Sequence, residues 1–213
     1  MLSLLLAAAQ LSLPIAIGTR VHDVRAIFSN NDFPEYLIRS APIWRVVFTR
    51  TTVRPDGTTQ GCIAEISSGD SELDSYTCHL IVKRAKFQAA TWTDGSPAYG
   101  VLRMPVAWVA GSSPPPPRAT PPHLELSVNR LPKGAHSDDS IFLEIAADAT
   151  GHVLSCAEQP PLTLSNPKRH FPELVEIACE QAAKTLTVTP AHDETGKPVR
   201  SVQSLTVGFK TSH

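Results

Sequence analysis

The chain has 213 residues, of which 42% are hydrophobic and 18% charged, and its formal net charge is −1. This composition is that of a globular protein and excludes an intrinsically disordered chain. The near-zero net charge also excludes an overall electrostatic attraction to nucleic acid or to anionic lipid. A chain of this length forms one large domain or two small ones.

The chain begins with an uncharged apolar stretch, "MLSLLLAAAQLSLPIAIG". Residues 2–13 have the length of the hydrophobic region of a secretory signal, Pro14 ends that region, and Ala16 and Gly18 are small residues at the positions that a signal peptidase recognises. We predict a signal peptide over residues 1–18. The alternative is a retained membrane anchor, for which the stretch is short, because a spanning helix needs about 20 apolar residues.

Two strands and a turn are expected next. Residues 45–53 are rich in Val, Phe and Thr and end at the turn signal Pro55-Asp56-Gly57. Residues 59–67 resume as a second strand, with Cys62, Ala64 and Ile66 on one face. The two segments together predict a β-hairpin.

A helix and a last strand complete the first half. Ser71 is the expected N-cap of the helix, with Asp74 three residues later as an approximate capping box. Apolar residues at helical spacing continue to Phe87. A turn at residues 93–95 then leads to a strand in which alternate residues face inward: Leu102, Met104, Val106 and Trp108.

Residues 111–122, "GSSPPPPRATPP", separate the two halves of the chain. Four consecutive prolines adopt an extended polyproline II conformation and cannot join a sheet or helix, so this segment is a semi-rigid spacer. The alternative is a ligand for an SH3-type domain, which an exported protein would rarely meet.

The second half repeats the plan. Its predicted elements are strands at residues 141–147 and 152–157 around a turn at Thr150-Gly151, a helix at 172–184 and a last strand at 201–209 with Leu205, Val207 and Phe209 on one face. The inward face of the first strand is ambiguous. In the first half, the apolar residues Val46 and Phe48 lie on one face of the strand. In the second half, the apolar residues are at positions that correspond, through the offset between the copies, to the opposite face: Ile141, Leu143 and Ile145.

Matching spacings identify the two halves as copies of one unit. In each copy, the first cysteine lies five residues after a glycine, and the second cysteine lies 17 residues before another glycine. In both copies this second glycine is followed by a proline two residues later and by an aromatic residue 13 residues later. The offset between copies is 94 residues at the first cysteine and 101 from the second cysteine onward. One insertion of seven residues within residues 159–174 accounts for the difference.

The four cysteines are expected to form two disulfides, one in each copy. An even count behind a signal peptide indicates a disulfide framework, and no C-x-x-C motif supports a zinc site. Pairing within each copy joins the second strand to the helix: Cys62 to Cys78, and Cys156 to Cys179. We therefore predict an α+β fold with two tandem units, residues 28–110 and 123–210, each a three-stranded antiparallel sheet covered by one helix. The alternative is four buried free thiols in a cytosolic protein.

Several segments resemble the C-terminal domain of TonB-family proteins. In the first half the resemblance covers residues 32–109 and rests on "DFPEYLIR", "RPDG", "SSG", "LDSYTC" and "KRAKFQAA". In the second half it rests on the spacings and on "HVLSC", "ELVEIAC" and "DETGKPVRSVQSLTVGF". The second half thus resembles a diverged duplicate of the first. The residues that match the family motif are Pro55, Asp56, Gly57, Ser67, Ser68, Gly69, Arg84 and Phe87.

The resemblance implies a helix–hairpin–helix–strand fold and a binding role in the periplasm, and envelope transport is one process that such a role could serve. Such domains capture an extended protein or peptide partner of the cell envelope by adding it as a strand to an exposed edge, which in this family is the last strand. Pro105 lacks the N–H that an added strand needs, so the second copy supplies the better acceptor edge. The expected partner-binding residues are Gln203, Ser204, Leu205, Thr206, Val207, Gly208 and Phe209.

Two alternatives to this function remain open. A membrane-anchored energy transducer of the TonB type requires a retained N-terminal helix with polar residues and a long proline-rich spacer before the domain, and residues 1–18 lack both features. Membrane association is expected only if this segment is retained. The other alternative is a structural cell-envelope protein without an exchangeable ligand, in which the two units hold each other or a fixed partner.

No enzyme, cofactor, metal or nucleic-acid function is predicted, because the sequence contains no nucleophile elbow, P-loop, HExxH or dinucleotide-binding motif. His79 beside Cys78 is a candidate catalytic pair, but a surface histidine next to a disulfide explains it better. Acidic residues at the start of the first helix favour its dipole. Arg84 is expected to cap carbonyls at the end of that helix, and Phe87 to fill the core.

Overall fold

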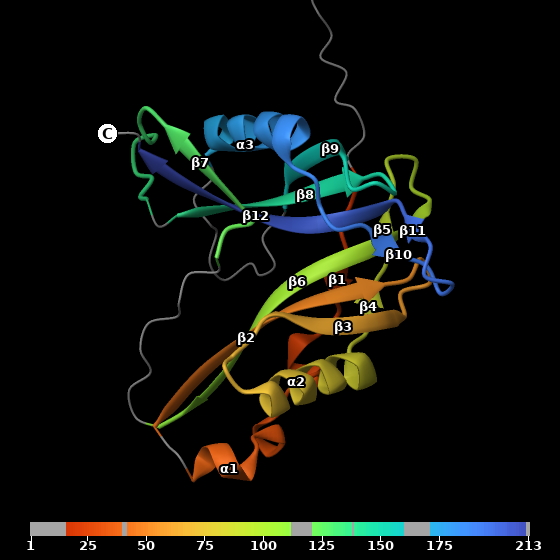
Figure 1. Cartoon of the computed structure of the whole chain (residues 1–213), viewed down its shortest axis with the longest axis vertical. Coiled ribbons are helices and arrows are strands. Elements are labelled where there is room, and N and C mark those ends of the chain that lie inside the picture. The colour runs from red at the N-terminus through yellow and green to blue at the C-terminus, as the bar shows by residue number, and fades with distance from the viewer. Residues whose placement is uncertain (1–15, 40–41, 112–120, 138, 160–170, 212–213) are drawn as a thin grey trace, which may run out of the picture.

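The computed structural model describes residues 16–39, 42–111, 121–137, 139–159 and 171–211. The greater part of the predicted signal peptide, most of the proline-rich spacer and most of the segment expected to hold the seven-residue insertion lie outside these ranges. We call residues 16–111 the first half and residues 121–211 the second half. In Figure 1 the colour runs from red and yellow in the first half to green and blue in the second.

The first half contains the predicted strand–strand–helix–strand unit, preceded by short N-terminal elements. Its elements are β1 (Arg20–Val21), the 3-10 helices η1 (Val24–Ala26) and η2 (Asn30–Asp32), α1 (Glu35–Ile38), β2 (Ile43–Val53), β3 (Thr59–Ile66), α2 (Ser71–Arg84), β4 (Phe87–Gln88), β5 (Ala90–Thr91) and β6 (Pro97–Ala110).

The second half repeats this unit and adds one strand before it. Its elements are β7 (Leu124–Val128), β8 (Ser140–Ala147), β9 (Val153–Glu158), α3 (Pro172–Thr185), β10 (Ala191–His192), β11 (Pro198–Val199) and β12 (Ser201–Thr211). The repeat unit is thus β2–β3–α2–β6 in the first half and β8–β9–α3–β12 in the second. β7 has no counterpart in the repeat.

The two units share one eight-stranded sheet, which corrects the expectation of two separate three-stranded sheets. The sheet path is β3-β2-β6-β12-β8-β9, with β5 added to β6 and β7 added to β12. β6 and β12 meet in parallel over three residue pairs, from Ser201 opposite Tyr99 to Gln203 opposite Val101. Joining the last strands satisfies backbone groups that two isolated sheets would leave unpaired at their edges.

The helices α2 and α3 cover opposite faces of this sheet (Figure 1). The register explains why. Val101 and Gln203 are paired in parallel and therefore point to the same face. In β6, Leu102 and α2 lie on the face opposite to Val101. In β12, Leu205 lies on the same face as Gln203 and packs in the core with α3. The units are thus related by an approximate two-fold rotation about an axis along the strands.

Each unit has its own hydrophobic core between its helix and its strands. The predicted inward residues of the last strands are buried core residues from Leu205 to Phe209 in the second half and, in the first, at Leu102, Val106 and Trp108, with Met104 partly buried against them. The ambiguity in the first strand is also resolved, because both copies bury the same set of positions. Those positions are Val47, Thr49, Thr51 and Val53 in β2, and Ile141, Leu143, Ile145 and Ala147 in β8.

The segment before the first hairpin attaches the two halves to each other. The backbone N–H of Gly18 donates a hydrogen bond to the buried carboxylate of Glu144 in β8 at 2.8 Å, and Arg20 forms an ion pair with the same carboxylate. Ile17 forms a β-bridge with Thr91. The expected cleavage position after Gly18 therefore lies within a segment that packs against the second half.

Candidate functional site

The predicted acceptor edge, residues 203–209 of β12, lies in the interior of the sheet. β8 pairs with one side of β12 from Ser201 to Gly208. On the other side, β6 pairs with residues 201–203 and β7 pairs with residues 207–211. The expectation of an open edge at β12 is therefore wrong for this arrangement of the chain, because two other segments already occupy its second side.

Side chains fill the middle of that second side, where β6 and β12 diverge. The backbone N–H of Arg103 donates to Ser204 Oγ at 2.9 Å, and its guanidinium donates to the Ser204 carbonyl at 2.8 Å. Next along β12, the backbone N–H of His123 donates to the Thr206 carbonyl at 2.8 Å, and the Thr206 N–H donates to His123 Nδ1 at 3.0 Å. His123 thus holds the start of β7 against β12.

Glu65 of β3 joins these groups into one polar cluster. Its carboxylate lies 2.9 Å from Arg103 Nε and 3.6 Å from His123 Nε2. Burial alone would raise the pKa of Glu65, but the nearby His123 imidazole and the charge of Arg103 outweigh it and lower the pKa to about 2. Because Nδ1 accepts the Thr206 N–H, the neutral imidazole carries its proton on Nε2, which faces Glu65.

β7 is a strand that the sequence analysis did not predict. It runs parallel to β12, with Leu124 opposite Val207 and Val128 opposite Thr211. Its half-buried Leu124, Leu126 and Val128 pack against the second core, while Glu125 forms an exposed ion pair with Lys210 at 2.6 Å. The alternation of apolar and polar residues in "LELSV" is the sequence signal that identifies such a strand.

The family-motif residues of the first hairpin have structural roles. Gly57 adopts a φ of +85° in the turn, and Asp56 accepts hydrogen bonds from the hydroxyl and N–H of Thr58, which lower the pKa of its carboxyl. Ser67 and Ser68 both donate to the Asp74 carboxylate, and Ser67 Oγ also accepts the Gly69 N–H.

The N-cap of α2 corrects one prediction. Asp70, not Ser71, is the cap, because its carboxylate accepts the N–H groups of Glu72 and Leu73. Asp74 makes no capping box, because Ser67 and Ser68 engage its carboxylate instead.

The C-terminal end of α2 differs from the prediction that Arg84 caps the carbonyls of its own helix. The helix ends at Arg84, and the Arg84 guanidinium donates to the Ile27 carbonyl at 3.1 Å and to Asp32 at 2.6 Å, rather than to the carbonyls of its own helix. Arg84 therefore anchors the N-terminal elements. Phe87 lies beyond the helix in β4 and is buried in the first core, so its predicted packing role is confirmed.

Both predicted disulfides are present, with Cα–Cα distances of 5.3 Å for Cys62–Cys78 and 5.4 Å for Cys156–Cys179. All four cysteines are bonded, so the exposed His79 has no thiol beside it to activate. Among the described residues, no group of three His, Cys, Asp or Glu side chains is placed to hold a metal ion.

No family model, curated protein or solved structure matches the chain. The resemblance to the TonB C-terminal domain therefore rests on the quoted residues and their spacing. Of the helices in the described ranges, none has both the length and the apolar character needed to cross a membrane.

Proposed function

We propose that the protein is a periplasmic, TonB-like binding module that captures an extended peptide by strand addition, and that β12 becomes the acceptor edge when β7 leaves it. The observation that carries this proposal is β7 itself. It is an extended segment outside the repeat unit, and it is added in parallel to the edge of β12 over five residue pairs. The two disulfides are compatible with an oxidising compartment.

The contacts of β7 suit exchange with a competing strand. It has only five residues, its apolar side chains are half-buried, and the ion pair between Lys210 and Glu125 joins side chains that are 59% and 51% exposed. Ordering a residue costs roughly 1–2 kcal/mol, while a backbone hydrogen bond returns a net gain of about 1 kcal/mol. Because these quantities are similar, the backbone pairing alone contributes little net free energy, and the half-buried apolar side chains supply most of what holds β7 in place.

β7 also indicates the chemistry of the partner. Apolar residues at alternate positions face the second core, and polar residues between them face away. A peptide that replaces β7 therefore needs an extended conformation, apolar side chains at every second position and no proline at the positions whose N–H groups face β12. Selectivity comes from the pockets that Leu124, Leu126 and Val128 now fill.

The occupied edge favours one competing function, that of a structural envelope protein without an exchangeable ligand. In that case β7 is a permanent part of the sheet, and the bonds between His123 and Thr206 serve only to fix it. The two functions differ in whether a free peptide can compete with β7.

A peptide titration separates them. The probe is a synthetic peptide with the sequence of residues 121–130, "PPHLELSVNR", added to isotope-labelled protein. The acceptor is the double variant Leu124→Ser with Leu126→Ser, which weakens the apolar contacts of β7. We expect backbone amide shifts concentrated at residues 206–211, stronger in this variant than in the wild type.

The controls address folding and specificity. Ile63→Ser changes an exposed residue of β3, and it should bind the peptide no better than the wild type does. A peptide with prolines at the positions of Leu126 and Ser127 lacks one N–H that faces β12 and should not bind, because N–H groups alternate in direction along a strand. If the double variant keeps its fold and its two disulfides but shows no shifts, the structural function is correct.

A further inference from the structure

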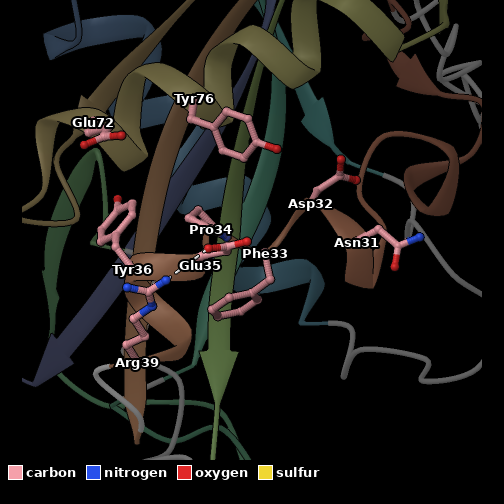
Figure 2. Close-up of a pocket in the computed structure, with 9 residues that line it drawn as sticks. All are labelled: Asn31, Asp32, Phe33, Pro34, Glu35, Tyr36, Arg39, Glu72 and Tyr76. Atoms are coloured by element: carbon pink, nitrogen blue, oxygen red, sulfur yellow. Dashed lines mark hydrogen bonds and ion pairs between the residues drawn. The ribbon is translucent and has the colours of Figure 1, made fainter.

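A pocket of about 680 Å³ lies beside the N-terminal turns of α2, remote in sequence from β12. Its walls come from α2 and from the segment that contains η2 and α1 (Figure 2). This segment is fixed to α2 at two points. Arg84 bonds Asp32, and the Tyr36 hydroxyl donates to Asp70 Oδ2 at 3.0 Å.

The lining is aromatic and rigidly supported. Phe33 and Tyr76 both contact the buried indole of Trp108, with ring-centroid distances of 5.6 Å and 5.9 Å. Tyr36 contributes a third ring, which Figure 2 shows beneath Glu72 and apart from Tyr76. The pocket is thus lined by three rings, of which Phe33 and Tyr76 are held by contacts with Trp108 and Tyr36 by its hydrogen bond to Asp70.

The charges around the pocket are mainly negative. Asp32 and Glu35 line the pocket. Asp32 is paired with Arg84, and Glu35 is paired with Arg39, the one cationic side chain among the lining residues. The Glu72 carboxylate also lines it, and within the described residues Glu72 makes no ion pair. Glu72 is therefore the carboxylate that remains available to a ligand.

Burial and the nearby carboxylates both affect the pKa of the Tyr36 phenol. Its pKa is raised to about 12, first by burial, then by the hydrogen bond to Asp70 and by the charges of Asp70, Glu72 and Asp74. Each carboxylate disfavours a second negative charge on the phenol. The same negative charges attract a cation.

We propose that this pocket binds a basic side chain of a peptide, with its cationic group against the ring of Tyr76 and the carboxylate of Glu72. Aromatic faces attract cations, and a carboxylate forms a charge-assisted hydrogen bond with guanidinium or ammonium. An arginine suits both contacts, because its planar group stacks on a ring while its N–H groups reach a carboxylate. This site does not depend on the exchange of β7.

The second half supplies matched controls through the offset of 101 residues. Glu173 is the counterpart of Glu72 in the first turn of α3, and Ile177 is the counterpart of Tyr76. Glu173→Gln therefore removes an equivalent exposed carboxylate without touching the pocket. Tyr76→Ile removes the aromatic ring while introducing the residue that the second unit carries at that helix position.

The test uses Nα-acetyl-arginine methylamide as the probe and the citrulline analogue as its neutral counterpart of nearly equal shape. Titration of isotope-labelled protein should give saturable amide shifts at residues 33–39 and 70–76, with a dissociation constant on the order of 1 mM. Citrulline should bind roughly tenfold more weakly or not at all. Added salt should weaken arginine binding, because the carboxylate is exposed to solvent.

The variants decide which contacts bind the cation. We expect Glu72→Gln to weaken arginine binding roughly tenfold and Tyr76→Ile to weaken it several-fold, whereas Glu173→Gln leaves it unchanged. The proposal is overturned if arginine and citrulline bind equally, if Glu72→Gln behaves like Glu173→Gln, or if no saturable shifts occur around the pocket. Failure of the β12 peptide titration leaves these outcomes unaffected, because that probe reports on residues 206–211.

Discussion

The two halves of the molecule share one backbone plan but place their core volume differently. Under α2 the sheet contributes the small Thr49 and Thr51, and the helix contributes the large Ile81. Under α3 the equivalent sheet residues are Leu143 and Ile145, and the equivalent helix residue is Ala182. The large side chains thus lie on the helix in one half and on the sheet in the other. Such volume-conserving exchanges preserve core packing, which explains how the fold repeats while few residues are identical.

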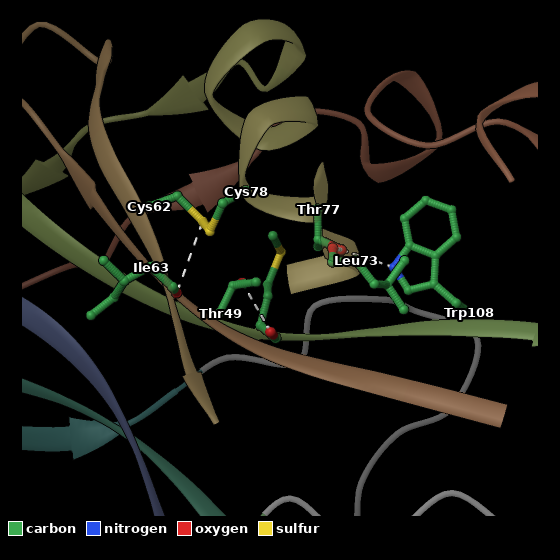
Figure 3. Close-up of a disulfide and its surroundings, with 8 residues drawn as sticks. Thr49, Cys62, Ile63, Leu73, Thr77, Cys78 and Trp108 are labelled. Atoms are coloured by element: carbon green, nitrogen blue, oxygen red, sulfur yellow. Dashed lines mark hydrogen bonds between the residues drawn. A yellow bond between two sulfur atoms is a disulfide. The ribbon is translucent and has the colours of Figure 1, made fainter. Parts of the chain in front are cut away.

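The two halves also differ at one pair of buried positions, which is polar in the first half and apolar in the second. Figure 3 shows the indole of Trp108 beside Thr77, and Trp108 Nε1 donates to Thr77 Oγ1 at 2.9 Å. At the equivalent positions the second half has Phe209 and Ala178, which need no hydrogen bond. The indole and the hydroxyl therefore occur together in the first half and are both absent at these positions of the second, because a buried indole N–H without a partner would be costly.

The largest expected effect comes from removing either disulfide. Cys62–Cys78 closes a separation of 16 residues and Cys156–Cys179 one of 23, so replacing either pair with serines should lower the free energy of unfolding by about 3 kcal/mol. Because the two closed loops differ little in length, the two losses should be nearly equal.

Two spectroscopic signals make this a test of coupling between the halves. All three tryptophans, Trp44, Trp92 and Trp108, belong to the first half, so fluorescence reports on that half, whereas far-ultraviolet circular dichroism reports on both. We expect the two urea transitions to coincide in both double variants, because β6 pairs with β12 and Arg50 bonds the carbonyls of Thr189 and Pro190. Separate transitions would show that the halves unfold independently.

An intermediate effect is expected from transferring volume between α3 and its sheet. Ala182→Ile introduces the first-half residue into a completely buried position and should cost about 1–3 kcal/mol through overpacking. Adding Ile145→Thr, which introduces the first-half residue in β8, should recover part of that loss. A double-mutant cycle measured by urea unfolding gives the coupling, and additive losses would contradict compensation between these two positions.

The sequence sufficed to predict what local spacing determines. The turns, the paired strands, both helices and both disulfides follow from glycine positions, apolar periodicity and cysteine spacing. The inward face of β2 did not follow, because Thr49 and Thr51 are polar residues at core positions, and Thr49 satisfies its hydroxyl on the Met104 carbonyl. Hydrophobic pattern alone assigns such residues to the surface.

Contacts between the halves were the part that periodicity could not predict. The pairing of β6 with β12 depends on the mutual placement of two complete units, and a pattern within either unit carries no information about it. The contact of Arg84 with Asp32 could not be predicted from periodicity either, because Asp32 lies 52 residues away in a segment with little regular structure. The occupied edge of β12 follows from its pairing with β6 and β7.

The smallest expected effect is an acid destabilisation that depends on this Asp32 contact. The hydrogen bond from Arg84, followed by that from the Ser29 hydroxyl, holds the pKa of Asp32 well below its ordinary value of 3.8. A carboxyl with a lowered pKa in the folded state stabilises the fold above its unfolded pKa, and this contribution is lost as the pH falls through the folded pKa. Glu65, with a pKa of about 2 against an ordinary 4.5, loses its contribution between these two values.

Replacing Asp32 isolates its share of this dependence. Asp32→Asn should be less stable than the wild type at pH 6, and the difference should shrink as the pH is lowered below about 4, because the wild type then begins to lose the same interaction. Urea unfolding at several pH values measures this difference, with Glu173→Gln in the second half as a variant that should show no such convergence. A difference that stays constant from pH 6 to pH 2 would mean that Asp32 contributes through its shape and neutral hydrogen bonds, and that its charge does not stabilise the N-terminal elements against α2.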